Sequence, residues 1–243
     1  MKYLLFCISL MVILVSVTAT AEESHQQVFH SSQAKANAAI AHLLEDNAKF
    51  SAARSSAYFE PFIEGQSPLV TVVGCSDSRV HMHAVDQTPD NDVFVIRNIG
   101  NQLATAQGSV EYGVHHLHTP LLLFIGHSGC GAVTAALSDY SKESPAIKRE
   151  LDTIQVNKGS TVTKEVVSNV NNQVAEAIET FASQTHDGSL AVMGAIYDFR
   201  DDYHHGQGKL IVINLNGETD PTKIRQSPLL AGIRDVIVGI TLP

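Results

Sequence analysis

The stretch LVTVVGCSDSR, residues 69–79, carries the two features from which the fold can be predicted. Its first part is an unbroken run of apolar and β-branched residues, which is typical of a strand buried on both faces of a parallel sheet. Gly74 ends this run, and Cys75, Asp77 and Arg79 follow at alternate positions. Because side chains two residues apart point to the same side of an extended segment, we expect these three to share one side of the strand end.

A second stretch, LLLFIGHSGC at residues 121–130, has the same organisation. Its apolar strand ends at Gly126 and is followed by His127 and Cys130, which share one face if the chain turns helical there. Further apolar runs predict strands at residues 92–96, 190–196 and 210–215. Helical patterns are found at residues 33–54, 109–117, 132–137 and 162–181.

Strands that alternate with helices predict an α/β fold with a mostly parallel central sheet of four to five strands, flanked by helices. No internal repeat, charge block or low-complexity linker divides the chain, so we expect residues 22–243 to form a single domain. Within it, residues 22–65 are predicted to form an N-terminal helical arm, because the apolar residues of the 33–54 helix lie on roughly one face.

The composition excludes several classes of protein. Of the 243 residues, 44% are hydrophobic and 17% are charged, which is too apolar and too weakly charged for a disordered chain. The chain has 16 basic and 25 acidic residues and a formal net charge of −9. Since binding to phosphates depends largely on cationic side chains, this balance argues against nucleic acid or an anionic membrane as the main partner.

The N-terminus has the pattern of a secretory signal. Lys2 is followed by an apolar run over residues 4–17, and Ala19 and Ala21 are the small residues that a signal peptidase reads. The alternative is a membrane anchor, but this run is shorter than the ~20 residues that cross a bilayer. We therefore predict a signal peptide at residues 1–21, cleavage near Ala21, and export to the periplasm or the medium. Cys7 leaves with this peptide.

The two polar strand ends are predicted to meet. Neighbouring strands of a parallel sheet lie ~5 Å apart, and ligands bind at the edge formed by their carboxyl ends. Cys75, His127 and Cys130 can therefore converge on one metal ion, and two thiolates with one imidazole form a three-ligand zinc site of the catalytic kind. Other interpretations remain open from the residues alone: thiols that are ordinary core residues, a Cys-His nucleophile and base, a disulfide, or an Asp77–Arg79 surface ion pair.

Together, the Cys-x-Asp-x-Arg motif at residues 75–79 and the His-x-x-Cys motif at residues 127–130 resemble the β-class carbonic anhydrases. The similarity runs over residues 66–137 at least, with a further match at residues 195–198. The resemblance implies one Zn²⁺ per chain on Cys75, His127 and Cys130. It also implies reversible hydration of carbon dioxide to bicarbonate and a proton, by attack of a zinc-bound hydroxide.

The same resemblance implies roles for two further residues. Asp77 would accept a hydrogen bond from the hydroxide, and Arg79 would hold Asp77 away from the metal through a charge-assisted pair. If that pair broke, Asp77 would become the fourth metal ligand and close the site. The pattern is similar to that of plant-like members with open sites, so we expect an open resting site at neutral pH.

The plant-like members also suggest a substrate pocket. Gln66 matches their substrate-binding glutamine, and Gly131 matches a glycine whose backbone N–H faces the substrate. The apolar wall is matched by Phe94, Ile99 and Tyr112. In that family the active site lies at a dimer interface, where Gln66 and part of the wall come from the neighbouring chain. A homodimer or a dimer of dimers is therefore expected, with the N-terminal arm around the partner.

Three alternative functions fit the same residues. The first is a carbon disulfide or carbonyl sulfide hydrolase on this fold, which would use the same zinc site with altered access. The second is an exported zinc protein without turnover, although the presence of both Asp77 and Arg79 disfavours it. The third is a cysteine hydrolase, which a metal analysis would separate from the others at once.

Overall fold

The computed structural model of the chain describes residues 32–240, so the predicted signal peptide lies outside the described residues and stays a prediction. The chain divides into two units, one up to Gly65 and one from Gln66 onward. Among the described residues, no helix is both long enough and apolar enough to cross a bilayer.

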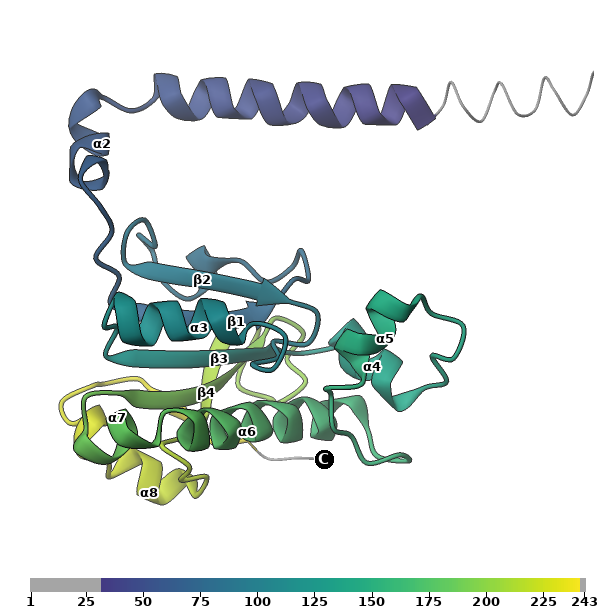
Figure 1. Cartoon of the computed structure of the whole chain (residues 1–243), viewed down its shortest axis with the longest axis vertical. Coiled ribbons are helices and arrows are strands. Elements are labelled where there is room, and N and C mark those ends of the chain that lie inside the picture. The colour runs from purple at the N-terminus through teal and green to yellow at the C-terminus, as the bar shows by residue number, and fades with distance from the viewer. Residues whose placement is uncertain (1–31, 241–243) are drawn as a thin grey trace, which may run out of the picture. The chain divides into compact units, whose positions relative to one another are not determined.

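The second unit is built on a six-stranded sheet with the strand order β2-β1-β3-β4-β5-β6, as Figure 1 shows in part. Strands β2, β1, β3 and β4 are parallel, β5 runs antiparallel to β4, and β6 is parallel to β5. The predicted α/β fold with a mostly parallel sheet is thus confirmed, with one strand more than expected. The strands are β1 (Val70–Cys75), β2 (Val93–Asn98), β3 (Leu121–His127), β4 (Ala191–Asp198), β5 (Lys209–Leu215) and β6 (Ile237–Val238).

The long helix α6 (Val162–Thr180) covers one face of the sheet (Figure 1). Its N-terminus is capped by Thr161, whose hydroxyl accepts a hydrogen bond from the Lys164 backbone N–H at 3.3 Å. The helix packs closely because Gly126 in β3 and Gly194 in β4 have no side chain, and a Cβ at either position would collide with Val170. Val166, Val170, Val174 and Ala177, at helical spacing, are buried against the sheet.

The remaining helices of this unit are short and lie between the strands or follow them. The predicted 109–117 helix is observed as α3 (Gln107–Glu111) continued by a π-helical turn, η2 (Tyr112–His116). The others are η1 (Met82–Ala84), α4 (Gly131–Leu137), α5 (Pro145–Leu151), α7 (Ala182–Asp187), α8 (Pro221–Arg225) and η3 (Pro228–Leu230).

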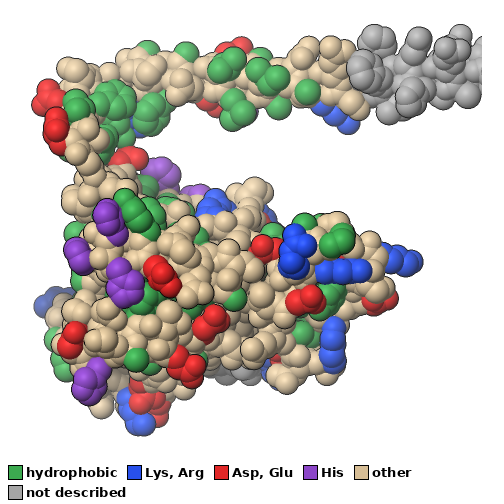
Figure 2. Space-filling view, viewed as in Figure 1, with side chains coloured by type: hydrophobic (Ala, Val, Ile, Leu, Met, Phe, Trp, Pro, Cys, Tyr) green, Lys and Arg blue, Asp and Glu red, His purple; other side chains and the backbone are tan. Residues whose placement is uncertain are grey.

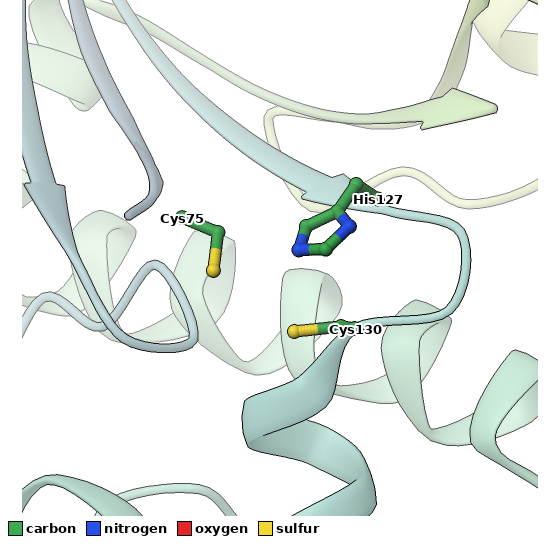
Figure 3. A group of neighbouring side chains, drawn as sticks. All are labelled: Cys75, His127 and Cys130. Carbon is green, nitrogen blue, oxygen red and sulfur yellow. The ribbon is translucent and has the colours of Figure 1, made fainter. Parts of the chain in front are cut away.

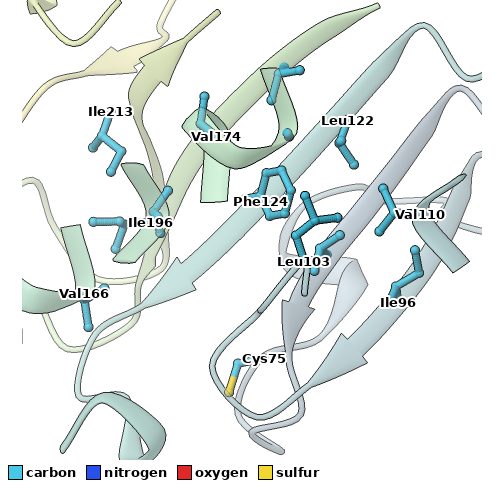
Figure 4. Close-up of a cluster of buried hydrophobic side chains, with 14 of the residues drawn as sticks. Cys75, Ile96, Leu103, Val110, Leu122, Phe124, Val166, Val174, Ile196 and Ile213 are labelled. Carbon is cyan, nitrogen blue, oxygen red and sulfur yellow. The ribbon is translucent and has the colours of Figure 1, made fainter. Parts of the chain in front are cut away.

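The main hydrophobic core lies between the sheet and these helices (Figure 4). It is centred on fully buried strand residues such as Leu122 and Phe124 in β3 and Ile196 in β4. Cys75 belongs to the same cluster and lies at the carboxyl end of β1 (Figure 4). The core therefore holds this thiol rigidly at the edge of the sheet where a ligand can reach it.

The first unit consists of a helix over residues 32–52 and the short helix α2 (Ser56–Ile63). Within it, the Phe50 and Tyr58 rings pack edge to face with centroids 6.1 Å apart, and the Arg54 guanidinium lies 3.4 Å from the Phe50 centroid. The apolar face of the long helix stays exposed, with Leu43 69% and Leu44 67% accessible. Apolar side chains are visible along this helix in Figure 2.

Candidate metal centre

The first and third strands bring the candidate ligands together. Because β1 and β3 are parallel neighbours with Gly74 opposite Ile125, Cys75 and His127 emerge side by side at the carboxyl edge of the sheet. The two sulfur atoms of Cys75 and Cys130 and a ring nitrogen of His127 lie within 4.8 Å of one another, and they point toward a common centre (Figure 3). All three residues are buried.

A tight turn after β3 delivers the third ligand. Gly129 takes a left-handed conformation with φ of 61°, and the chain then enters α4 with Cys130 as its N-cap residue. The backbone N–H groups of Ala132 and Val133, in the first turn of α4, favour the thiolate of Cys130. Those of Gly100 and Asp77 favour the thiolate of Cys75 in the same way. These backbone groups partly offset, at Cys130, the hydrogen bond to Cys75 and the burial that raise the pKa of this thiol.

The chemistry of this donor set fits a divalent cation such as zinc. His127 Nδ1 lies 3.1 Å from the Ser128 carbonyl oxygen, whereas Nε2 is buried and has no hydrogen-bond partner among the described residues. A hydrogen bond from the Cys130 thiol lowers the pKa of Cys75 to about 4, against the opposing effect of burial, and the same hydrogen bond raises the pKa of Cys130. A bound divalent cation would be coordinated by both thiolates and by His127 Nε2.

The predicted Asp77–Arg79 pair forms beside the cluster. Arg79 donates from Nε to Asp77 Oδ1 at 2.8 Å and from Nη2 to Asp77 Oδ2 at 2.6 Å, so the contact is bidentate. These hydrogen bonds hold the pKa of Asp77 well below its usual range. Asp77 Oδ2 lies 4.0 Å from His127 Nε2. The carboxylate is therefore next to the ligands, and both of its oxygens are engaged by Arg79.

Arg97 supports the site in a way that the sequence analysis missed. Its Nε donates to the Cys75 carbonyl at 2.9 Å and its Nη2 donates to the Asp77 carbonyl at 2.7 Å. The side chain therefore fixes the backbone that carries the first ligand and the Asp77 carboxylate. The available signal was the charge of Arg97 near the carboxyl end of a mostly apolar strand, where it pairs with Gly74.

The predicted substrate residues fall into two groups in this chain. Ile99 follows the β2 residue paired with Cys75, and Gly131 follows Cys130, so both lie at the ligand edge of the sheet. Phe94, by contrast, pairs with Thr71 near the start of β1, and its ring lies 5.8 Å from that of Tyr112. Gln66 precedes β1 and is exposed. Gln66, Phe94 and Tyr112 thus lie toward the opposite strand ends from the ligands of the same chain.

A buried Cys-His-Cys set at the carboxyl edge of a parallel sheet defines a candidate metalloenzyme of the α/β class. Comparisons with known proteins narrow this class. The carbonic anhydrase family model matches residues 70–204. "Carbonic anhydrase 2" of Mycobacterium tuberculosis is 43% identical over 75 residues, which cover 30% of this chain and 36% of that protein.

Two further relatives cover more of the chain. The carbonic anhydrase of Emericella nidulans is 28% identical over 208 residues, which cover 76% of this chain and 84% of that protein. The β-carbonic anhydrase of Coccomyxa, solved in complex with acetazolamide, has a TM-score of 0.61 at 27% identity and covers 76% of this chain and 90% of its own.

This chain belongs to the β-carbonic anhydrase family, because the family model matches more than half of its length. The match to the mycobacterial relative spans only about a third of that protein's length. The matched region contains the two motifs that carry the candidate ligands and the Asp77–Arg79 pair.

Proposed function

We propose that this protein catalyses the reversible hydration of carbon dioxide to bicarbonate and a proton, with one Zn²⁺ per chain held by Cys75, His127 and Cys130. The observation that carries the proposal is the convergence of two thiols and one unpartnered imidazole nitrogen, all buried, beside an ionised carboxylate. Membership of the carbonic anhydrase family supports the same reaction.

The proposed division of labour follows from the contacts of each side chain. When bound, zinc lowers the pKa of water from 15.7 to ~7 and so supplies a nucleophile at neutral pH. Asp77 lies within reach of the ligand set, where its carboxylate would accept a hydrogen bond from the attacking group and so orient it. Arg79 keeps Asp77 ionised and directs its lone pairs, because both oxygens are fixed by a bidentate contact. The open arrangement follows, since the carboxylate is committed to Arg79 rather than to the metal.

The reaction is tested by stopped-flow hydration of carbon dioxide on the purified protein. We expect about one zinc per chain, and we expect hydration to fall to the uncatalysed rate after a chelator removes the metal. Added zinc should restore the rate, and added magnesium serves as the control because it disfavours thiolate ligands. An uncatalysed rate with zinc fully loaded would exclude carbonic anhydrase activity and leave a zinc protein without this turnover.

We also propose that two copies of the chain complete one substrate pocket. Within one chain, Phe94 is displaced along the strands from the ligands by about 13 Å for a four-residue step, and Gln66 and Tyr112 lie toward the same strand ends. A second copy that contributes these residues would close the pocket over the metal. The exposed apolar face of the 32–52 helix gives such a dimer an additional surface to bury.

Complementation between two defective variants tests this dimer. A Cys130→Ser chain lacks a ligand, and a Tyr112→Ala chain lacks part of the pocket wall. If pockets are shared, a mixed dimer pairs intact ligands with an intact wall, and co-expression should restore about a quarter of the wild-type activity by random pairing. Co-expression that gives no more than the sum of the two separate variants, or a monomeric mass by ultracentrifugation, would contradict the shared pocket.

A further inference from the structure

Phe199, which follows directly after β4, packs against two parts of the site at once. Its ring is stacked on the His127 imidazole with centroids 5.9 Å apart and an interplanar angle of 23°. The Arg79 guanidinium carbon lies 4.8 Å from the centroid of the same ring. Phe199 is partly buried and packs against a second hydrophobic cluster that includes Tyr197, and the same ring also faces these two groups of the site. The Phe199 ring therefore contacts both a candidate metal ligand, His127, and the arginine that holds Asp77.

The segment that carries Phe199 is held in place by a buried carboxylate. Asp198 is fully buried, and its side chain accepts backbone N–H groups from Asp202 at 3.0 Å and Tyr203 at 2.9 Å. Its own carbonyl accepts the Gly208 N–H at 2.7 Å. Asp201, within this loop, takes a left-handed conformation with φ of 67°, which aspartate adopts more readily than most non-glycine residues.

The same segment also contacts the turn between the second and third ligands. The Arg200 N–H lies 3.3 Å from Ser128 Oγ, and the Ser128 N–H donates to the Tyr197 carbonyl at 3.2 Å. The Arg200 side chain lies against Gly129, where a Cβ would collide with the guanidinium. Residues 197–200 therefore pack along the turn from His127 to Gly129.

We propose that Phe199 is a positioning residue of the metal centre, which fixes the ring plane of His127 and the guanidinium of Arg79 through one aromatic face. The part of this inference that concerns turnover rests on the proposed function. The part that concerns the metal does not, because the plane of the imidazole governs how its nitrogen meets any cation. A leucine at this position fills similar space but offers neither a stacking face nor a cation–π partner.

The test is the rate at which zinc passes from the protein to a chromogenic chelator. In Phe199→Leu we expect this rate to rise about tenfold, as for the loss of a residue that orients a metal ligand. Phe199→Tyr keeps the aromatic face and should stay within about twofold of wild type. Cobalt-substituted protein adds a spectroscopic measure, because a rotated imidazole shifts the visible absorption bands in Phe199→Leu but not in Phe199→Tyr.

Phe181→Leu is the matched control. Phe181 is a buried core residue whose ring lies 5.4 Å from His115, which is not one of the candidate ligands. Its truncation should lower the melting temperature without changing zinc release. Zinc release from Phe199→Leu within twofold of wild type, or an equal increase in Phe181→Leu, would overturn the positioning role.

A double-mutant cycle in hydration assays tests the link to Arg79. If the ring acts through this arginine, Phe199→Leu should reduce kcat/KM about tenfold in the wild type but less than about threefold in an Arg79→Lys background. Equal reductions in both backgrounds would overturn the Arg79 part of the proposal. A wild type that takes up no zinc would overturn this inference together with the proposed function, whereas zinc uptake without hydration of carbon dioxide would overturn the function alone.

Discussion

Cys130→Ser is expected to reduce the hydration of carbon dioxide by more than about 1,000-fold, because the protein loses the metal that ionises water near neutral pH. Cys130 is one of three buried candidate ligands, and a serine hydroxyl is a harder and less acidic donor than a thiol at the same position. Elemental analysis measures the loss of zinc, and stopped-flow hydration measures the loss of activity on the same sample.

The same variant should be less stable than the zinc-loaded wild type. A ligand that binds only the folded state stabilises it by about 4 kcal/mol when present at about 1,000 times its Kd, and this contribution disappears with the metal. Thr134→Ser is the matched control, because Thr134 donates to the Cys130 carbonyl at 2.8 Å and serine keeps that hydroxyl. Stoichiometric zinc and unchanged hydration in Cys130→Ser would exclude Cys130 as a ligand.

Asp77→Asn should retain zinc and lose about 100-fold in kcat/KM, the loss typical when one positioned hydrogen-bonding group of an active site is removed. An amide at this position keeps one acceptor but turns an N–H group toward Arg79, which disrupts the bidentate contact. The low pKa of Asp77 keeps the wild-type carboxylate ionised throughout the neutral range, so the ratio of the two rates should not change with pH there. Asp152→Asn, which makes the same carboxylate-to-amide change at the acceptor of a Tyr140 hydrogen bond elsewhere on the chain, is the control.

Arg79→Ala is the complementary change to Asp77→Asn. It releases the carboxylate from its partner, and we expect Asp77 to enter the zinc coordination shell in a crystal structure of the variant. The wild type should keep Asp77 on Arg79 under the same conditions. A wild-type zinc shell that includes an Asp77 oxygen at pH values above neutrality would contradict the open site, and a loss of zinc from Asp77→Asn would indicate a role in metal binding instead.

Much of the fold could be predicted from the sequence because the buried parallel strands are uniform apolar runs that end at glycine. Leu69 to Val73 and Leu121 to Ile125 are of this kind, and the apolar run with a glycine after it predicts the strands observed as β1 and β3. Strand β6 was missed because Ile237 and Val238 are too short a run to show a period, and its pairing is supplied by β5. The ligand triad followed from the topology, since strand ends in a parallel sheet meet at one edge.

The parts of the site that were missed depend on side-chain directions that spacing does not reveal. Phe199 follows a buried strand and has the sequence context of an ordinary core aromatic residue. Only the loop that Asp198 organises places the ring of Phe199 between His127 and Arg79. The displacement of Phe94 from the ligands of its own chain follows from the strand register, whereas the expectation of a shared pocket came from the family resemblance alone.

The division of the ligands between β1 and β3 has a consequence for how the chain acquires its cation. Strand β2 and α3 separate the two in sequence, so a partly folded chain in which β1 has not joined β3 presents only the His127 and Cys130 side chains to a metal. Full coordination of the proposed zinc ion would then coincide with pairing of β1 with β3, so metal binding would come late in folding. The ion would link two segments that are distant in sequence, and its binding would mark completed assembly of the sheet centre.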